Sequence, residues 1–104
     1  ENHVSESITT LTSLGGNRHL LIDCSHGNSY KLHTNQSIVL HNVLNQIQKG
    51  NNLISGVMVE SHLVEGAQKI NGNPEKLVYG QSCTDACIGW DETEYLIQYM
   101  FNIL

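Results

Sequence analysis

Residues 53–60 read LISGVMVE, a mostly apolar run that ends at Glu60. An earlier run, HLLID at residues 19–23, is short, apolar and without alternation, as expected of a strand that is covered on both faces. We therefore predict two buried strands, His19–Asp23 and Leu53–Val59. Both runs lead directly into polar residues, so each strand is expected to end at a segment that can carry chemistry.

Helical patterns precede each of these strands. Val4–Leu14 carries apolar residues at spacings of four and three, and Gly15-Gly16 supplies the left-handed residue that commonly ends a helix. A second helix is predicted from about Thr34 to Lys49, closed by Gly50. Its expected inner face consists of Ile38, Val43, Leu44 and Ile47.

The last part of the chain divides into a long loop and a third helix. Ser61–Trp90 is polar and has little periodicity, which indicates a loop. The helix is expected to start at Asp91 as its N-cap, because Glu94 follows three residues later in a capping-box-like arrangement. Its expected apolar face consists of Leu96, Ile97, Met100, Phe101 and Leu104.

The resulting order is helix, strand, helix, strand, long loop, helix, which indicates βα units and a parallel sheet. Two parallel strands alone would both be edge strands, although each has the composition of a central strand. Further strands are therefore expected, from an earlier part of a longer chain or from a partner copy. The length of 104 residues suits one domain at most, and since the chain begins with Glu1 and not Met, we expect that it was cut from a longer protein.

Composition excludes several classes of protein. The net charge is −5, and the five cationic residues are scattered, so no basic stripe for nucleic acid exists: Arg18, Lys31, Lys49, Lys69 and Lys76. No apolar run approaches the ~20 residues that span a membrane. The three cysteines, in a chain without a secretory signal, favour reduced thiols and a cytoplasmic location.

Polar groups at the two strand ends and in the loop suggest a metal site. In parallel α/β folds the ligand lies at the carboxyl ends of the strands. His26 follows the first strand, Glu60 ends the second, and Asp85 lies in the long loop. One imidazole and two carboxylates suit a first-row divalent metal. Each residue also has a plainer reading: a hydrogen-bonded loop histidine, a glutamate that pairs with a lysine, and a turn aspartate.

Three longer motifs carry a family resemblance. DCSHGNS at residues 23–29, GVMVESHLVEG at 56–66 and YGQSCTDACIGW at 79–90 are similar, almost word for word, to 3-deoxy-D-arabino-heptulosonate 7-phosphate (DAHP) synthases of the type regulated by aromatic amino acids. The resemblance covers the whole chain but only the last third of the usual family sequence. It implies the carboxyl-terminal part of a (β/α)8 TIM barrel: helix 6, strand 7, helix 7, strand 8, a long loop and helix 8.

The resemblance also implies an activity. Family members condense phosphoenolpyruvate with erythrose 4-phosphate in the first step of the shikimate pathway. His26, Glu60 and Asp85 match the family's metal ligands, His26 being also a catalytic residue, and the fourth ligand is a cysteine upstream of the residues present here. The divalent metal (Mn, Fe, Co or Zn) is expected to act as a Lewis acid on the aldehyde oxygen of erythrose 4-phosphate. We expect a homo-oligomer.

Four further residues are expected to support the site. His62 is a candidate to orient Glu60 from outside the ligand set. Asn28 and Ser29 either shape the loop after the first strand or contact substrate, and we favour loop shaping. Cys87 is expected to lie near the missing cysteine, by the same resemblance.

The charge distribution limits what this chain can do alone. The single arginine, Arg18, precedes a strand and therefore lies at the end of the sheet away from the expected site. Phosphorylated substrates need arginine forks and lysines. The chain alone is thus expected to be inactive. Two alternatives remain: a non-catalytic truncated remnant that self-associates and at most binds metal, and a small metal-binding module unrelated to this chemistry.

Overall fold

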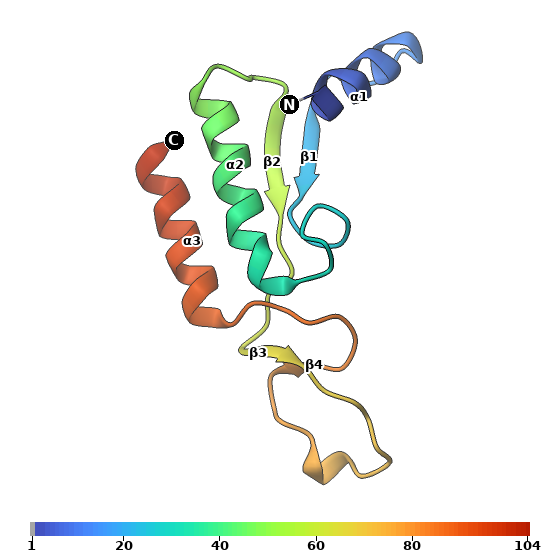
Figure 1. The fold of residues 1–104 in the computed structure, drawn as a ribbon, viewed down its shortest axis with the longest axis vertical. Coiled ribbons are helices and arrows are strands. Elements are labelled where there is room, and N and C mark those ends of the chain that lie inside the picture. The colour runs from blue at the N-terminus through green and yellow to red at the C-terminus, as the bar shows by residue number, and fades with distance from the viewer. Residues whose placement is uncertain (1) are drawn as a thin grey trace.

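The computed structural model describes residues 2–104, which form three helices around a short parallel sheet, with an extension at one end (Figure 1). The principal elements are α1 (Asn2–Ser13), β1 (Leu20–Asp23), α2 (Gln36–Gln48), β2 (Ile54–Met58), β3 (Val64–Ala67), β4 (Gln81–Ser82) and α3 (Trp90–Ile103). None of the helices in this described part is long and apolar enough to cross a membrane.

The two predicted strands pair in parallel, as expected, but they are not covered on both faces in this chain, since Leu21 of β1 is 67% exposed. Leu20 lies opposite Ile54 and Asp23 opposite Met58, with one register shift after Leu20. The ladder continues past the last pair, because the Cys24 N–H donates to the Met58 carbonyl at 2.8 Å. Parallel pairing brings both carboxyl ends to the same edge of the sheet, so the residues that follow the strands start out side by side.

Helix α2 covers the sheet and contributes more buried apolar residues than any other element, but its buried face differs in part from the prediction. Val43 and Leu44 are buried as predicted, and Ile47 is partly buried. The prediction for Ile38 is wrong, since that side chain is 66% exposed and Leu40 is fully buried instead. Leu40, Val43, Leu44 and Ile47 share one face at helical spacing, and a residue two positions before Leu40 falls on the opposite face.

Helix α3 packs beside α2 and β2 through one narrow side (Figure 1). Leu96 is buried and Met100 packs against it, but the other predicted face residues are exposed: Ile97 (52%), Phe101 (86%) and Leu104 (71%). The predicted N-cap is also wrong, because Gly89 precedes the helix with extended backbone and Asp91 lies in the first turn. A carboxylate there still interacts favourably with the helix dipole.

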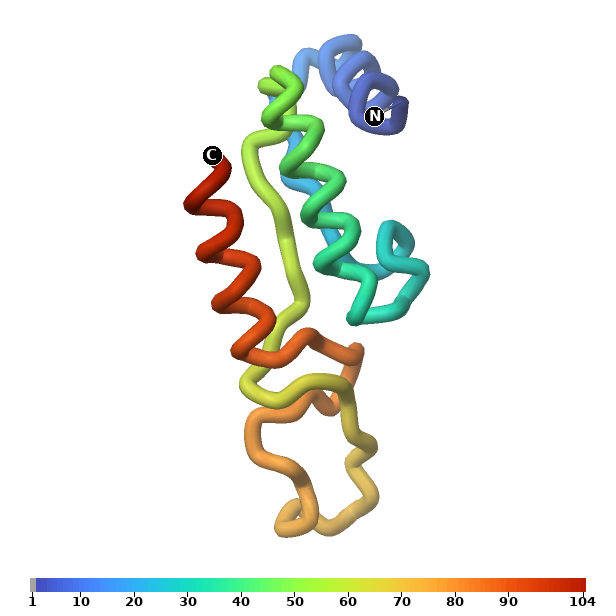
Figure 2. The backbone as a smooth tube through the Cα atoms, turned by 60° about the vertical axis from the view of Figure 1, so that its left-hand side comes forward, coloured from blue at the N-terminus to red at the C-terminus, as the bar shows by residue number. Residues whose placement is uncertain are grey.

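The segment predicted as a long irregular loop contains secondary structure. β3 and β4 pair in parallel and project beyond the sheet, away from α1 (Figures 1 and 2). The Gln68 amide organises the extension, because it donates to the Val78 carbonyl at 2.8 Å and accepts from the Val78 N–H at 2.8 Å. These strands are too short to show a period in the sequence.

Candidate metal centre

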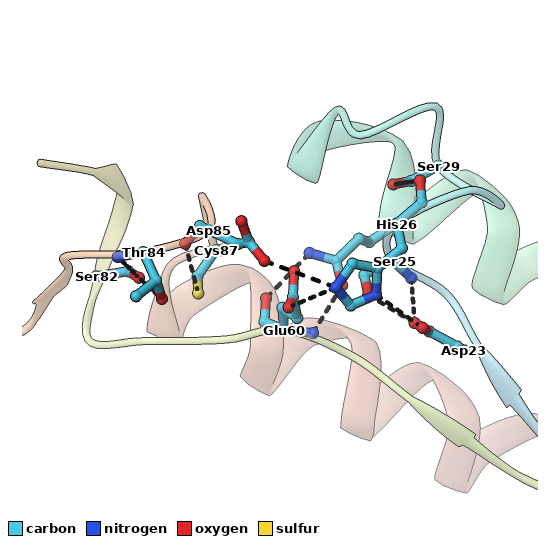
Figure 3. Close-up of polar contacts among 10 residues, drawn as sticks. Asp23, Ser25, His26, Ser29, Glu60, Ser82, Thr84, Asp85 and Cys87 are labelled. Carbon is cyan, nitrogen blue, oxygen red and sulfur yellow. Dashed lines mark hydrogen bonds and ion pairs between the residues drawn. The ribbon is translucent and has the colours of Figure 1, made fainter.

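Three acidic or imidazole side chains from distant parts of the chain meet at the carboxyl edge of the sheet. His26 follows β1 by three residues, Glu60 follows β2 by two, and Asp85 comes from the loop between β4 and α3. One ligand atom from each lies within 4.8 Å of the others, a cluster not repeated elsewhere in residues 2–104 (Figure 3). The three residues predicted as metal ligands are therefore close enough to share one ion.

His26 directs its two ring nitrogens to different partners. Nδ1 lies 2.8 Å from Asp23 Oδ2 and 2.7 Å from Ser25 Oγ. Nε2 faces the cluster, 3.3 Å from Glu60 Oε1 and 3.6 Å from Asp85 Oδ2. The hydrogen bond with Asp23, followed by the charge of Glu60, raises the pKa of His26 above its usual value. The imidazole thus links a carboxylate behind it with two in front.

Asp23 and Ser25 form a support that the sequence analysis did not identify. Asp23 Oδ1 accepts from the Ser25 N–H at 2.8 Å and from the Ser25 hydroxyl at 2.6 Å. Burial opposes ionisation of Asp23, but hydrogen bonds from Ser25 and His26 outweigh it and lower the pKa. The signal was present in the sequence as a carboxylate three residues before a histidine, since that spacing lets the two side chains meet across a turn.

Glu60 is held through its backbone by Gln36, which the sequence analysis also missed. The Gln36 side chain is completely buried. Its amide donates to the Glu60 carbonyl at 3.0 Å, and its oxygen accepts from the Glu60 N–H at 2.7 Å. The amide therefore acts like one more strand partner and fixes where Glu60 leaves the sheet.

Backbone pairing brings the Asp85 loop to the same place. The Ile88 N–H donates to the Glu60 carbonyl at 3.0 Å, and the His62 N–H donates to the Ile88 carbonyl at 3.0 Å. Ile88 is fully buried in the core with Leu96. Asp85 thus sits three residues before an anchored position, while its own side chain is 70% exposed.

The expected supporting residues bond mainly to nearby backbone. Asn28 Nδ2 donates to the Asp23 carbonyl at 2.7 Å, and the buried Ser29 hydroxyl donates to the His26 carbonyl at 3.2 Å. The exposed His62 accepts from its neighbour's N–H through Nδ1 at 2.8 Å. The Cys87 thiol lies 3.5 Å from the Asp85 carbonyl, and burial raises its pKa.

The chemistry of the cluster fits a cation. Two carboxylates and an imidazole nitrogen face one another, and within residues 2–104 no lysine or arginine pairs with either acid. Uncompensated acceptors at this separation repel one another unless a proton or a cation lies between them. A pocket of about 180 Å³ adjoins the cluster, with Lys31 and His33 on its wall. A mixed nitrogen and oxygen set is suited to first-row divalent metals.

Comparisons with known proteins agree with the motifs. The model of the DAHP synthetase I family matches residues 1–98. The Phe-sensitive phospho-2-dehydro-3-deoxyheptonate aldolase of Escherichia coli (strain K12) is 46% identical over 100 residues, which cover 96% of this chain and 28% of that protein. The Trp-sensitive enzyme of the same strain is 43% identical over 95 residues, which cover 91% of this chain and 27% of that protein.

A solved structure of another such aldolase is also similar to this chain. The phospho-2-dehydro-3-deoxyheptonate aldolase of Francisella tularensis SCHU S4 superposes with a TM-score of 0.89 at 43% identity, over 99% of this chain and 29% of that one. The chain therefore spans little more than a quarter of the length of these relatives.

Proposed function

The chain belongs to the DAHP synthetase I family, and we propose on that basis that it forms the carboxyl-terminal part of a (β/α)8 barrel that condenses phosphoenolpyruvate with erythrose 4-phosphate. In this proposal β1 and β2 are strands 7 and 8, and α1, α2 and α3 are helices 6, 7 and 8. The free outer edges of both strands support it, because each edge would pair with a strand of the remaining barrel.

The observation that carries the proposal is the convergence of His26, Glu60 and Asp85 within 4.8 Å. These residues would hold a divalent metal (Mn, Fe, Co or Zn), and a fourth ligand would come from an earlier part of a longer chain. The two carboxylates would balance the charge of the ion. His26 would be both ligand and catalytic residue, since its Nε2 is directed into the cluster.

When bound, the metal supplies Lewis acidity toward the aldehyde oxygen of erythrose 4-phosphate. The protein's own groups orient the ligands around it. Asp23 holds the far side of the His26 ring, and Gln36 holds the backbone of Glu60. Lys31 supplies the one lysine or arginine charge among the described residues that line the pocket, where an anionic substrate group would be attracted.

One cation is far fewer than two phosphorylated substrates require. We therefore expect no turnover by the 104-residue chain alone, and activity only when the remaining barrel strands are supplied. The assay is loss of phosphoenolpyruvate absorbance in the presence of erythrose 4-phosphate and Mn²⁺. Metal-dependent turnover by the pure chain would contradict this expectation.

Metal binding can be tested in the chain as it stands. Titration calorimetry with Mn²⁺ should give one site, and His26→Gln or Glu60→Gln should weaken binding at least tenfold. Glu94→Gln is the matched control, because Glu94 is exposed on α3 away from the cluster. Equal affinities for all four proteins would reject the proposed site.

A self-associating, non-catalytic remnant is the second candidate. It is favoured by exposed apolar side chains in β1 and on α3, such as Leu21 (67%) and Phe101 (86%). Their burial between copies would stabilise a homo-oligomer. Light scattering that shows a stable monomer would count against this candidate, and genetic complementation of a strain lacking DAHP synthase would exclude it.

A further inference from the structure

We infer that Asp23, braced by Ser25, is a positioning residue that fixes the tautomer of His26 and leaves Nε2 free to bind a cation. The functional meaning of this role rests on the proposed metal site, whereas the tautomer itself is a property of the metal-free chain. Within residues 2–104 the side chains of Asp23 and Ser25 bond to each other and to His26, but not to Glu60 or Asp85, so both would act only through His26.

The direction of the hydrogen bond follows from the partners of Asp23. Its Oδ1 already accepts two hydrogen bonds from Ser25, at 2.8 and 2.6 Å, and such bonds favour the ionised carboxylate. An ionised carboxylate can only accept. The 2.8 Å contact between Oδ2 and His26 Nδ1 is therefore a hydrogen bond only if Nδ1 carries the proton. The Ser25 hydroxyl, whose one hydrogen goes to Oδ1, can likewise only accept at its 2.7 Å contact with Nδ1.

A neutral imidazole has only one N–H, so the proton on Nδ1 leaves a lone pair on Nε2. Nε2 is the nitrogen that faces Glu60 Oε1 at 3.3 Å and Asp85 Oδ2 at 3.6 Å. In the other tautomer an N–H would point into the cluster and occupy the place of a cation. The carboxylate behind the ring thus decides whether His26 is a ligand or a hydrogen-bond donor.

The backbone holds the His26 ring between Asp23 and the cluster, although His26 must adopt a strained conformation to do so. His26 has a φ of 45°, a left-handed conformation that is unfavourable for a residue with a Cβ. Its carbonyl is tied down by the Lys31 N–H at 2.8 Å and the Ser29 hydroxyl at 3.2 Å. The turn therefore holds the ring between Asp23 and the cluster.

A purely structural role must be distinguished from this one, because the Asp23–Ser25 bond also resembles an ordinary turn in which an aspartate accepts from the N–H two residues on. If Asp23 only stabilised the turn, its replacement would lower stability without exchanging the tautomers of His26. The tautomer is therefore the deciding measurement.

Asp23→Asn is the informative substitution. The two Ser25 donors should retain the amide oxygen on their side, which turns the amide NH₂ toward His26 Nδ1. Nδ1 then becomes an acceptor, and the proton moves to Nε2. The same exchange in a serine-protease triad leaves the geometry intact but gives the wrong tautomer. Ser25→Ala keeps the carboxylate and should keep the proton on Nδ1.

The tautomers can be read from long-range ¹H–¹⁵N spectra of the metal-free chain labelled in its histidine rings, at a pH where imidazole is neutral. The His26 signals are those lost in His26→Gln. We expect Nδ1–H in the wild type, Ser25→Ala and Asp91→Asn, and Nε2–H in Asp23→Asn. Asp91 is the matched control, an exposed acid on α3. Mn²⁺ affinity should fall about 10- to 100-fold in Asp23→Asn and stay unchanged in Asp91→Asn.

An Nε2–H tautomer in the wild type would overturn the inference, and this result does not depend on any variant folding. An unchanged tautomer in folded Asp23→Asn would also overturn it, even if metal affinity fell, because the role of Asp23 would then be structural. If the tautomers exchange as expected but the wild type binds no Mn²⁺, the positioning of His26 by Asp23 stands and the proposed metal function fails.

Discussion

Replacing the buried Gln36 with leucine should lower the free energy of unfolding more than a substitution on the exposed face of a helix would. The change removes the only hydrogen bond recorded for the Glu60 N–H, whereas the Glu60 carbonyl keeps its bond from the Ile88 N–H. One donor is then left unpaired next to an apolar side chain, which costs about 1–3 kcal/mol, and loss of the second bond adds about 1 kcal/mol. The expected decrease in the free energy of unfolding is therefore about 2–4 kcal/mol.

Gln46→Leu provides a matched control on the same helix. Gln46 Nε2 bonds only to Asn42 Oδ1 at 2.8 Å, and its Oε1 is buried without a partner. Removing an unsatisfied acceptor should leave stability unchanged or raise it slightly. Urea unfolding of both variants and the wild type, followed by circular dichroism, gives the comparison. A loss below about 1 kcal/mol for Gln36→Leu, or an equal loss for Gln46→Leu, would refute the reasoning.

Four other predictions concern the core, the cysteines, the extension and the metal. Burial, followed by the charge of Asp23, raises the pKa of Cys24 from its usual 9.0 to about 11. The unfolded thiol ionises first, so stability should decrease as the pH rises from 9.0 toward 11. In the folded chain iodoacetamide should modify the exposed Cys83 and spare Cys24, and equal labelling rates by mass spectrometry would contradict this. Gly80 has a φ of 79°, and an added Cβ would lie 2.8 Å from Leu63 Cβ. Gly80→Ala should therefore lower the free energy of unfolding, measured with urea, by about 2–4 kcal/mol. Gly72 has the same φ but no atom near the added Cβ, so Gly72→Ala should lower it by only about 1–2 kcal/mol. Equal losses in the two variants would exclude a steric contribution at Gly80. Free Mn²⁺ at about 100 times its dissociation constant should stabilise the chain by about 2.7 kcal/mol, roughly 10–20 °C in Tm, and EDTA should reverse the shift. The same shift in His26→Gln would show that the ion binds elsewhere.

The parallel strand pair and the convergence of His26 and Glu60 could be predicted, because both depend on local sequence and one rule of topology. HLLID and LISGVMV carry the apolar content of buried strands, and parallel pairing places His26 and Glu60 at a common edge. Asp85 was included because it lies in the long loop, and the family motif strengthened that choice. Nothing in its own neighbourhood indicates which end of the sheet the loop approaches.

The errors have a different origin. Ile38 was expected inside because it is apolar, yet the phase of α2 is set by what lies opposite the helix, and this places Leu40 in the core. On α3, the chain described here offers contacts to one side only, so Phe101 stays exposed. Gln36 could not be recognised, because its partner is 24 residues away and the bond is to backbone atoms. Tertiary pairing of this kind leaves no pattern in composition.

The loop that carries Asp85 pairs through Ile88 with the backbone of Glu60 and His62, just after β2, and this has a kinetic consequence. The three donors come from residues 26, 60 and 85, so the cluster is complete only after the last third of the chain has folded back onto the sheet. Closing such long loops is slow, and the contacts are expected to form after the main folding barrier. A cation that binds all three groups should then slow unfolding while leaving the folding rate nearly unchanged. The ion would therefore stabilise the chain after it has folded and would not take part in the folding nucleus.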